Sequence, residues 1–158
     1  NPSTNDAGAA TAAGVLAGLR GLLRVTDGDE RLGGRHYVIQ GLGAVGGALA
    51  KALVAAGAEV SAFDPDEAAR AEALRAGARI LSGSQVLTTP CDVFMPCALG
   101  GVIDADAAAR APWGAVCGCA NNQLSGPEVG EVLHARGIPW APDVVQHRST
   151  VALIKPGQ

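Results

Sequence analysis

The stretch HYVIQGLGAVGGALAKAL, residues 36–53, constrains the fold of this chain more than any other. It places Gly41, Gly43 and Gly46 in the spacing G-x-G-x-x-G, directly after a short apolar run and before a segment with helical periodicity. A strand, a glycine turn and a helix in this order can bind the pyrophosphate of a dinucleotide. Gly41 would allow the tight turn, Gly43 the close approach of the phosphates, and Gly46 the packing of helix on strand.

An acidic residue supports this interpretation in a chain whose 22 glycines make the spacing alone weak evidence. Asp64 follows the apolar segment AEVSAF and stands roughly 20 residues after the motif, where dinucleotide-binding folds carry an acid. Its carboxylate would accept hydrogen bonds from the adenosine ribose and repel a 2′-phosphate, which favours NAD over NADP. The alternative is that Asp64 only caps the next helix, a role that Asp66 could share.

Strand-like and helix-like segments alternate along the chain. We expect helices over residues 7–24, 44–57, 66–77, 104–111 and 127–137, and strands over 35–40, 58–63, 78–81, 91–96, 114–120 and 138–142. Thr4, Asn5 or Asp6 could cap the first helix, and residues 83–89 form a short helix or turn. This order implies right-handed crossovers. The predicted fold class is α/β, a doubly wound Rossmann-type parallel sheet with helices on both faces.

Composition and charge exclude several classes of protein. The formal net charge is −3 and basic residues do not cluster, so a nucleic-acid partner is not expected. Apolar runs fall short of the roughly 20 residues that a membrane span requires. The four cysteines lack the spacing of a zinc site, so we expect reduced packing residues, no metal and a cytoplasmic enzyme domain. The chain begins without Met, which predicts a piece of a longer protein or a trimmed chain.

Several segments together carry a family resemblance. They are TAAGV (11–15), VIQGLGAVGGALA (38–50), CDVFMPCALGGVI (91–103), ANNQL (120–124) and LHARGIPWAPD (133–143). In this order they resemble the cofactor-binding domain of the glutamate/leucine/phenylalanine/valine dehydrogenases, closest to the leucine, phenylalanine and valine branch. The resemblance implies NAD-dependent oxidative deamination of an apolar L-amino acid to its 2-oxo acid and ammonia. It predicts an NAD-binding Rossmann domain over residues 1–143 and a divergent tail over 144–158.

The resemblance also implies site residues. Thr11 matches a threonine near the nicotinamide amide, the loop Cys97–Gly100 passes the middle of the cofactor, and the segment at Asn121 lies beside the nicotinamide ribose. Asn side chains also commonly bond their own backbone in turns, and packing is an equal alternative for Cys97 and Thr11. The candidate cofactor-binding residues are Thr11, Gly41, Gly43, Ala44, Val45, Gly46, Asp64, Cys97, Ala98, Leu99, Ala120, Asn121 and Asn122.

Two departures from the family pattern concern catalysis. The resemblance implies that the catalytic lysine, its partner aspartate and most of the substrate pocket belong to an amino-terminal domain, which we expect to lie outside this sequence. The only lysines in the sequence are Lys51 and Lys155. His147 replaces a substrate-holding asparagine, and Arg148, Ser149 and Thr150 replace small residues. His147 could act as an acid or base, but a solvated tail residue is favoured. No catalytic residue is assigned.

Three functions therefore stay open. The leading one is the NAD-binding part of an amino-acid dehydrogenase, which alone binds NAD without turnover and meets its substrate through a missing or partner domain. The second is a stand-alone or degenerate dinucleotide-binding sensor module. The third is a small NAD-dependent oxidoreductase of another substrate class. A homo-oligomer is possible, and no membrane or nucleic-acid partner is expected.

Overall fold

A computed structural model describes residues 2–98, 103–119 and 124–141 of the chain. Five strands form one sheet in the order β3-β2-β1-β4-β5, and every neighbouring pair is parallel. The elements in chain order are α1 (Pro2–Asp27), β1 (His36–Gln40), α2 (Ala44–Ala55), β2 (Glu59–Phe63), α3 (Glu67–Ala76), β3 (Arg79–Ile80), β4 (Cys91–Pro96), α4 (Ala105–Arg110), β5 (Trp113–Val116) and α5 (Pro127–Ala135).

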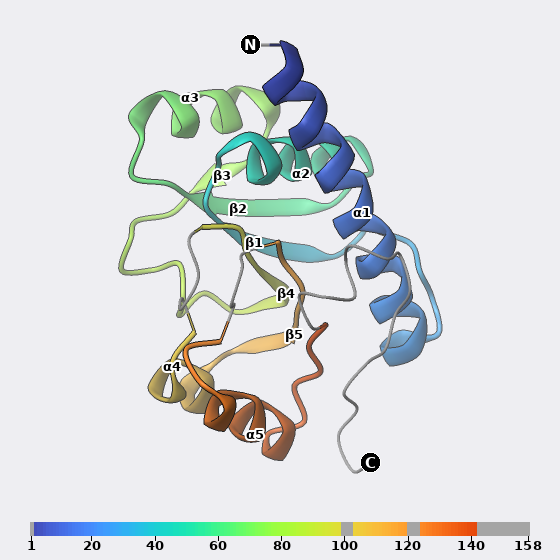
Figure 1. Cartoon of the computed structure of the whole chain (residues 1–158), viewed down its shortest axis with the longest axis vertical. Coiled ribbons are helices and arrows are strands. Elements are labelled where there is room, and N and C mark those ends of the chain that lie inside the picture. Colours follow the sequence, from blue (N-terminus) through green and yellow to red (C-terminus); the bar gives the residue numbers. More distant parts are fainter. Residues whose placement is uncertain (1, 99–102, 120–123, 142–158) are drawn as a thin grey trace.

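Helices cover both faces of the sheet (Figure 1). Buried apolar side chains of α1, α2 and α3 form one core with one face of the sheet, and those of α4 and α5 form a second core with the other face. A parallel sheet covered in this way needs strands that are apolar on both sides, and this explains the nearly continuous apolar runs in the sequence. The doubly wound α/β fold predicted from the sequence is confirmed.

Alternation along β1 assigns its side chains to the two cores. Tyr37 and Ile39 lie in the core under α1 and α2, whereas Val38 lies in the core under α4 and α5. Tyr37 is fully buried and its hydroxyl donates a hydrogen bond of 2.8 Å to the Leu32 carbonyl. By the same alternation, Gln40 at the end of β1 faces the second core.

The first helix is longer than the sequence indicated. α1 begins at Pro2 and ends at Asp27, whereas the predicted span was 7–24. Thr4, Asn5 and Asp6 therefore lie inside the helix, and the expectation that one of them caps it is wrong. Pro2 explains the earlier start, because proline is well tolerated in the first turn of a helix.

The last two predicted strands are shorter than expected. β5 ends at Val116, where residues 114–120 were predicted, and the segment 138–142 contributes only a parallel bridge between Val116 and Trp140. Pro139 lacks an amide hydrogen, so this segment cannot form a complete ladder against β5. The segment 83–89 forms a turn, one of the two predicted alternatives. Within the described part of the chain, no helix is long and apolar enough to cross a membrane.

Candidate functional site

The candidate site lies where the winding of the sheet reverses, at the carboxyl ends of β1 and β4. In doubly wound sheets this reversal opens the crevice in which ligands bind. Gly41 follows β1 directly and Cys97 follows β4 directly. The Cys97 amide donates a hydrogen bond of 2.7 Å to the Gln40 carbonyl, so the two loops leave the sheet side by side.

The conformation of the glycine loop requires two of its three glycines. Gly41 has φ +101°, and a Cβ there would lie 2.7 Å from the Ala98 amide nitrogen. A Cβ on Gly46 would lie 1.9 Å from the Gly41 carbonyl oxygen, an impossible overlap. Glycine at these positions lets α2 begin directly against the loop, with Ala98 on the other side. These are the conformational roles that the spacing predicted for Gly41 and Gly46.

The third glycine faces open space. Gly43 is exposed and precedes α2 as its N-cap residue without any side-chain cap, and a Cβ there would meet no atom within 4 Å. Ala44 is exposed and Val45 is partly buried against the first core. The first amides of α2 therefore lack a capping side chain, and the helix dipole adds partial positive charge at this end. An anion such as a pyrophosphate fits this helix end.

Asp64 connects the end of β2 to the glycine loop. Its Oδ2 accepts a hydrogen bond of 2.7 Å from the Leu42 amide, and its Oδ1 accepts one of 2.8 Å from the Asp66 amide. The residue that caps α3 is Asp66, which accepts a hydrogen bond from the Ala69 amide. Capping is therefore not the role of Asp64, whose carboxylate lies beside the glycine loop.

The amino-terminal half of α1 reaches the same end of the sheet. Gly8 is buried against Ala44, the first residue of α2, so closely that a Cβ on Gly8 would lie 2.8 Å from the Ala44 Cβ. Thr11 follows within one helical turn and is exposed. The packing of Gly8 on Ala44 thus brings this part of α1 beside the start of α2.

The cysteines near the site are neutral thiols. A side-chain hydrogen bond with Cys119 that favours the Cys97 thiol, and then burial, raise the pKa of Cys97 well above its usual range, and burial raises the pKa of Cys117 to about 12. Thiolates are the reactive form of cysteine, so these side chains pack and do not attack. None of the four cysteines forms a disulfide. Among the described residues, no group of three His, Cys, Asp or Glu side chains could hold a metal ion.

Two features of the site were missed by the sequence analysis. Gln40 ends β1 with a buried Oε1 that has no hydrogen-bond partner in the described structure. Its register neighbours, Phe63 and Pro96, offer no side-chain donor. Arg70 donates hydrogen bonds to two carbonyl groups of the turn after β2. A polar residue at the end of an otherwise apolar strand was the available signal for Gln40, but nothing in the spacing marked Arg70.

Some predicted site residues cannot be placed. Leu99, Ala120, Asn121, Asn122 and His147 lie outside the described residues. Lys51 is described: it lies on α2 and forms an exposed ion pair of 2.7 Å with Glu72 on α3, beside a groove of about 600 Å³ between the two helices. This pairing gives Lys51 a surface role.

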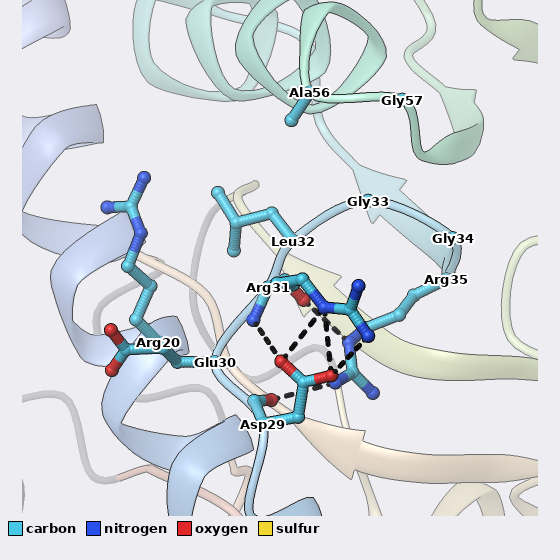
Figure 2. Close-up of a pocket in the computed structure, with 10 residues that line it drawn as sticks. All are labelled: Arg20, Asp29, Glu30, Arg31, Leu32, Gly33, Gly34, Arg35, Ala56 and Gly57. Atoms are coloured by element: carbon cyan, nitrogen blue, oxygen red, sulfur yellow. Dashed lines mark hydrogen bonds and ion pairs between the residues drawn. The ribbon is translucent and has the colours of Figure 1, made fainter.

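A second hollow, of about 890 Å³, lies at the opposite end of the sheet (Figure 2). Its walls are the connector before β1, the carboxyl end of α2 and Arg20 of α1. Figure 2 shows the Asp29 carboxylate beside Arg31, which binds it through both oxygens. Arg35 holds the same connector through the Asp29 carbonyl and an ion pair with Asp27. These contacts order the connector and are far from the glycine loop.

Comparison with known proteins agrees with this geometry. Residues 65–153, more than half of the chain, match the family described as Glutamate/Leucine/Phenylalanine/Valine dehydrogenase. The chain belongs to this dehydrogenase family. The phenylalanine dehydrogenase of Caldalkalibacillus thermarum (strain TA2.A1) is 36% identical over 146 residues, which are 89% of this chain and 40% of that protein. The leucine dehydrogenase of Geobacillus stearothermophilus is 33% identical over 144 residues, which are 90% of this chain and 39% of that protein.

A solved structure of the same kind has the same fold. The L-tryptophan dehydrogenase from Nostoc punctiforme superposes with a TM-score of 0.86 at 28% identity, over 90% of this chain and 44% of that one. The chain thus spans less than half the length of these dehydrogenases. The predicted family resemblance is confirmed, and membership of a dehydrogenase family indicates a nicotinamide cofactor.

Proposed function

We propose that residues 1–143 form the NAD-binding domain of an amino-acid dehydrogenase that acts on apolar L-amino acids, and that residues 144–158 are a separate tail. The observation that carries the proposal is the open amino end of α2, where Gly43 leaves space for a phosphate and no side chain caps the helix. The bridge from Val116 to Trp140 supports the domain boundary, because it attaches the chain to β5 up to Ala141.

NAD is the proposed cofactor, in preference to NADP. The Asp64 carboxylate lies beside the glycine loop and would face the 2′-position of an adenosine ribose bound there. A carboxylate accepts hydrogen bonds from ribose hydroxyls and repels a phosphate. Ala98 lies against Gly41, and Thr11 is exposed within one helical turn of Gly8; both belong to the proposed binding surface, together with Gly41, Gly46 and Cys97.

The proposed reaction converts an L-amino acid, NAD⁺ and water into a 2-oxo acid, ammonium, NADH and a proton. Bound NAD would accept the hydride from the amino-acid α-carbon. The reaction also requires a group that takes protons from the amine and from water. Lys51 lies at the groove between α2 and α3, where its ammonium group is held in an exposed ion pair with Glu72. We therefore expect this chain alone to bind NAD and to orient it without turnover.

Titration of NADH into the chain, followed by nicotinamide fluorescence, tests the binding site. Gly43→Ala should leave the melting temperature unchanged, because the added Cβ has open space. It should weaken NADH binding by about tenfold or more, because the methyl group would occupy the phosphate position. Gly47→Ala is the matched control, with a Cβ in ordinary contact at 3.6 Å from the Leu42 carbonyl oxygen, and should bind as the unchanged chain does. Absence of saturable NADH binding would overturn the proposal.

A second assay tests the claim about turnover. Leucine, phenylalanine and valine are each incubated with NAD⁺ and the chain, and NADH formation is followed by absorbance. We expect none above a sample without protein. Measurable turnover would show that a proton-moving group lies within this chain, and would favour a small self-sufficient oxidoreductase.

A further inference from the structure

Arg70 makes an unusual contact in the first turns of α3. A single guanidinium nitrogen, Nη1, donates hydrogen bonds of 2.8 Å to the Asp64 carbonyl and 2.9 Å to the Pro65 carbonyl. Both carbonyls belong to the turn that joins β2 to α3. Among the described residues Arg70 forms no ion pair, so its charge meets two neutral acceptors. Hydrogen bonds from a charged donor are stronger than neutral ones.

The clamped turn carries the Asp64 carboxylate. Each of its oxygens already accepts one backbone amide, Oδ2 from Leu42 and Oδ1 from Asp66. A carboxylate oxygen has two lone pairs, so each oxygen can accept one further hydrogen bond. The main chain at the turn is joined to the loop by another bond, from the Gly41 amide to the Phe63 carbonyl. Backbone and side-chain bonds together hold the carboxylate in one orientation.

We propose that Arg70 is a positioning residue for Asp64, and through it a determinant of the choice between NAD and NADP. This inference rests on the proposed function of the site. Arg70 holds the main chain of the turn, and the fixed main chain keeps the carboxylate against Leu42, with its second lone pairs available to ribose hydroxyls. Without the clamp the turn gains conformational freedom, and the carboxylate leaves this orientation part of the time.

The loss of orientation has opposite effects on the two cofactors. NADH binds less tightly, because its ribose hydroxyls lose an oriented acceptor. The affinity for NADPH rises relative to that for NADH, because the 2′-phosphate meets less repulsion from Asp64. If Arg70 instead held a 2′-phosphate directly, removing its charge would weaken NADPH binding more than NADH binding. A purely structural role would weaken both equally.

The test compares NADH and NADPH dissociation constants for the whole chain by nicotinamide fluorescence. Arg70→Ala should lower the preference for NADH over NADPH by about tenfold, mainly through weaker NADH binding. Arg70→Lys should keep most of the preference, because a single nitrogen makes both bonds and an ammonium group can replace it. Arg75→Ala is the matched control: it lies on the same helix, is exposed in the last turn, and should behave as the unchanged chain does.

The outcomes separate this inference from the proposed function. If the unchanged chain does not saturate with NADH, the proposed function fails and this inference fails with it. If it saturates and Arg70→Ala retains the original preference, only the role of Arg70 is overturned. If Arg70→Ala does not fold, Arg70→Gln and Arg70→Lys decide: the preference should fall with Gln and persist with Lys, and equal preference in the two variants overturns the inference.

Discussion

The Leu42 amide donates a hydrogen bond of 2.7 Å to Asp64 Oδ2, and this bond joins the glycine loop after β1 to the end of β2. The two residues are far apart in sequence, yet the loop that would receive the phosphates and the acid that would receive the ribose share one bond. In the proposed site, binding of the two ends of an adenosine diphosphate moiety would therefore be structurally connected. Changes to Asp64 should affect both cofactor selection and the loop itself.

Asp64→Ala should weaken NADH binding and reduce the preference for NADH over NADPH by about tenfold, which corresponds to about 1.4 kcal/mol. Fluorescence titration with both cofactors measures the effect. Asp66→Ala is the matched control, because it removes the cap of α3 and should cost about 1 kcal/mol of stability without changing the preference. An unchanged preference in Asp64→Ala would remove Asp64 from the site.

Gly46→Ala should destabilise the fold by about 3 kcal/mol, because its Cβ would overlap the Gly41 carbonyl oxygen and force α2 away from the sheet. Gly47→Ala, one position on, meets only an ordinary contact and should be neutral or stabilising by up to about 1 kcal/mol, since alanine favours helix. Chemical denaturation of both variants measures the difference. Equal stabilities would contradict the close packing at Gly46.

Stability should fall as the pH rises from about 9 to about 12. Burial raises the pKa of Cys117 from 9.0 to about 12 and that of Tyr37 from 10.0 to about 12. Between these values the unfolded chain has lost protons that the folded chain retains, so deprotonation favours unfolding. The stabilisation is complete below pH 9 and is lost as the pH approaches 12.

Urea denaturation at several pH values checks this dependence. Cys117→Ala should make the fall in stability above pH 9 shallower, while the onset stays near pH 9 because the pKa values of Cys91 and Cys97 are also raised. Tyr37→Phe should make the fall above pH 10 shallower, although loss of the hydrogen bond to Leu32 lowers stability at every pH. A pH dependence that is the same in all three chains would contradict this assignment.

Gln40→Met should raise the stability of the chain by about 1 kcal/mol, because it removes a buried acceptor that has no hydrogen-bond partner among the described residues and keeps a similar volume. Thermal unfolding without ligand measures the change. Gln85→Met provides the control, because the Gln85 Oε1 accepts a hydrogen bond of 2.9 Å from the Ser82 amide and its loss should not stabilise. A lower melting temperature for Gln40→Met would indicate that Gln40 has a partner in the folded chain.

Local patterns were sufficient to predict the sheet, its helices and the glycine turn. The motif at residues 41–46 and the apolar strands depend on neighbouring residues, and these determine both periodicity and backbone conformation. Neighbouring residues alone do not predict which of Asp64 and Asp66 lies at the glycine loop and which caps α3. Both are acids at a helix start, and only the tertiary bond to Leu42 separates the residue at the loop from the helix cap.

Contacts between distant elements explain the remaining differences. The clamp from Arg70 uses main-chain carbonyl groups, which every residue has, so no sequence pattern marks its acceptors. The early start of α1 was not predicted because the apolar periodicity begins only at residue 7, whereas a proline such as Pro2 is tolerated in the first turn of a helix. The segment at Trp140 was predicted to be a strand because it is apolar. A strand paired with β5 also needs backbone amide hydrogens, and Pro139 has none.

The contact between Gly8 and Ala44 fixes how α1 is turned about its own axis. Only a hydrogen atom fits between the two helices there, so a residue with a side chain rotated into this place would bring a carbon atom within 2.8 Å of the Ala44 Cβ. The contact therefore restricts the rotation of α1 against α2. The absence of a side chain at Gly8 thus helps to set which face of α1, and with it the exposed Thr11, is turned away from α2.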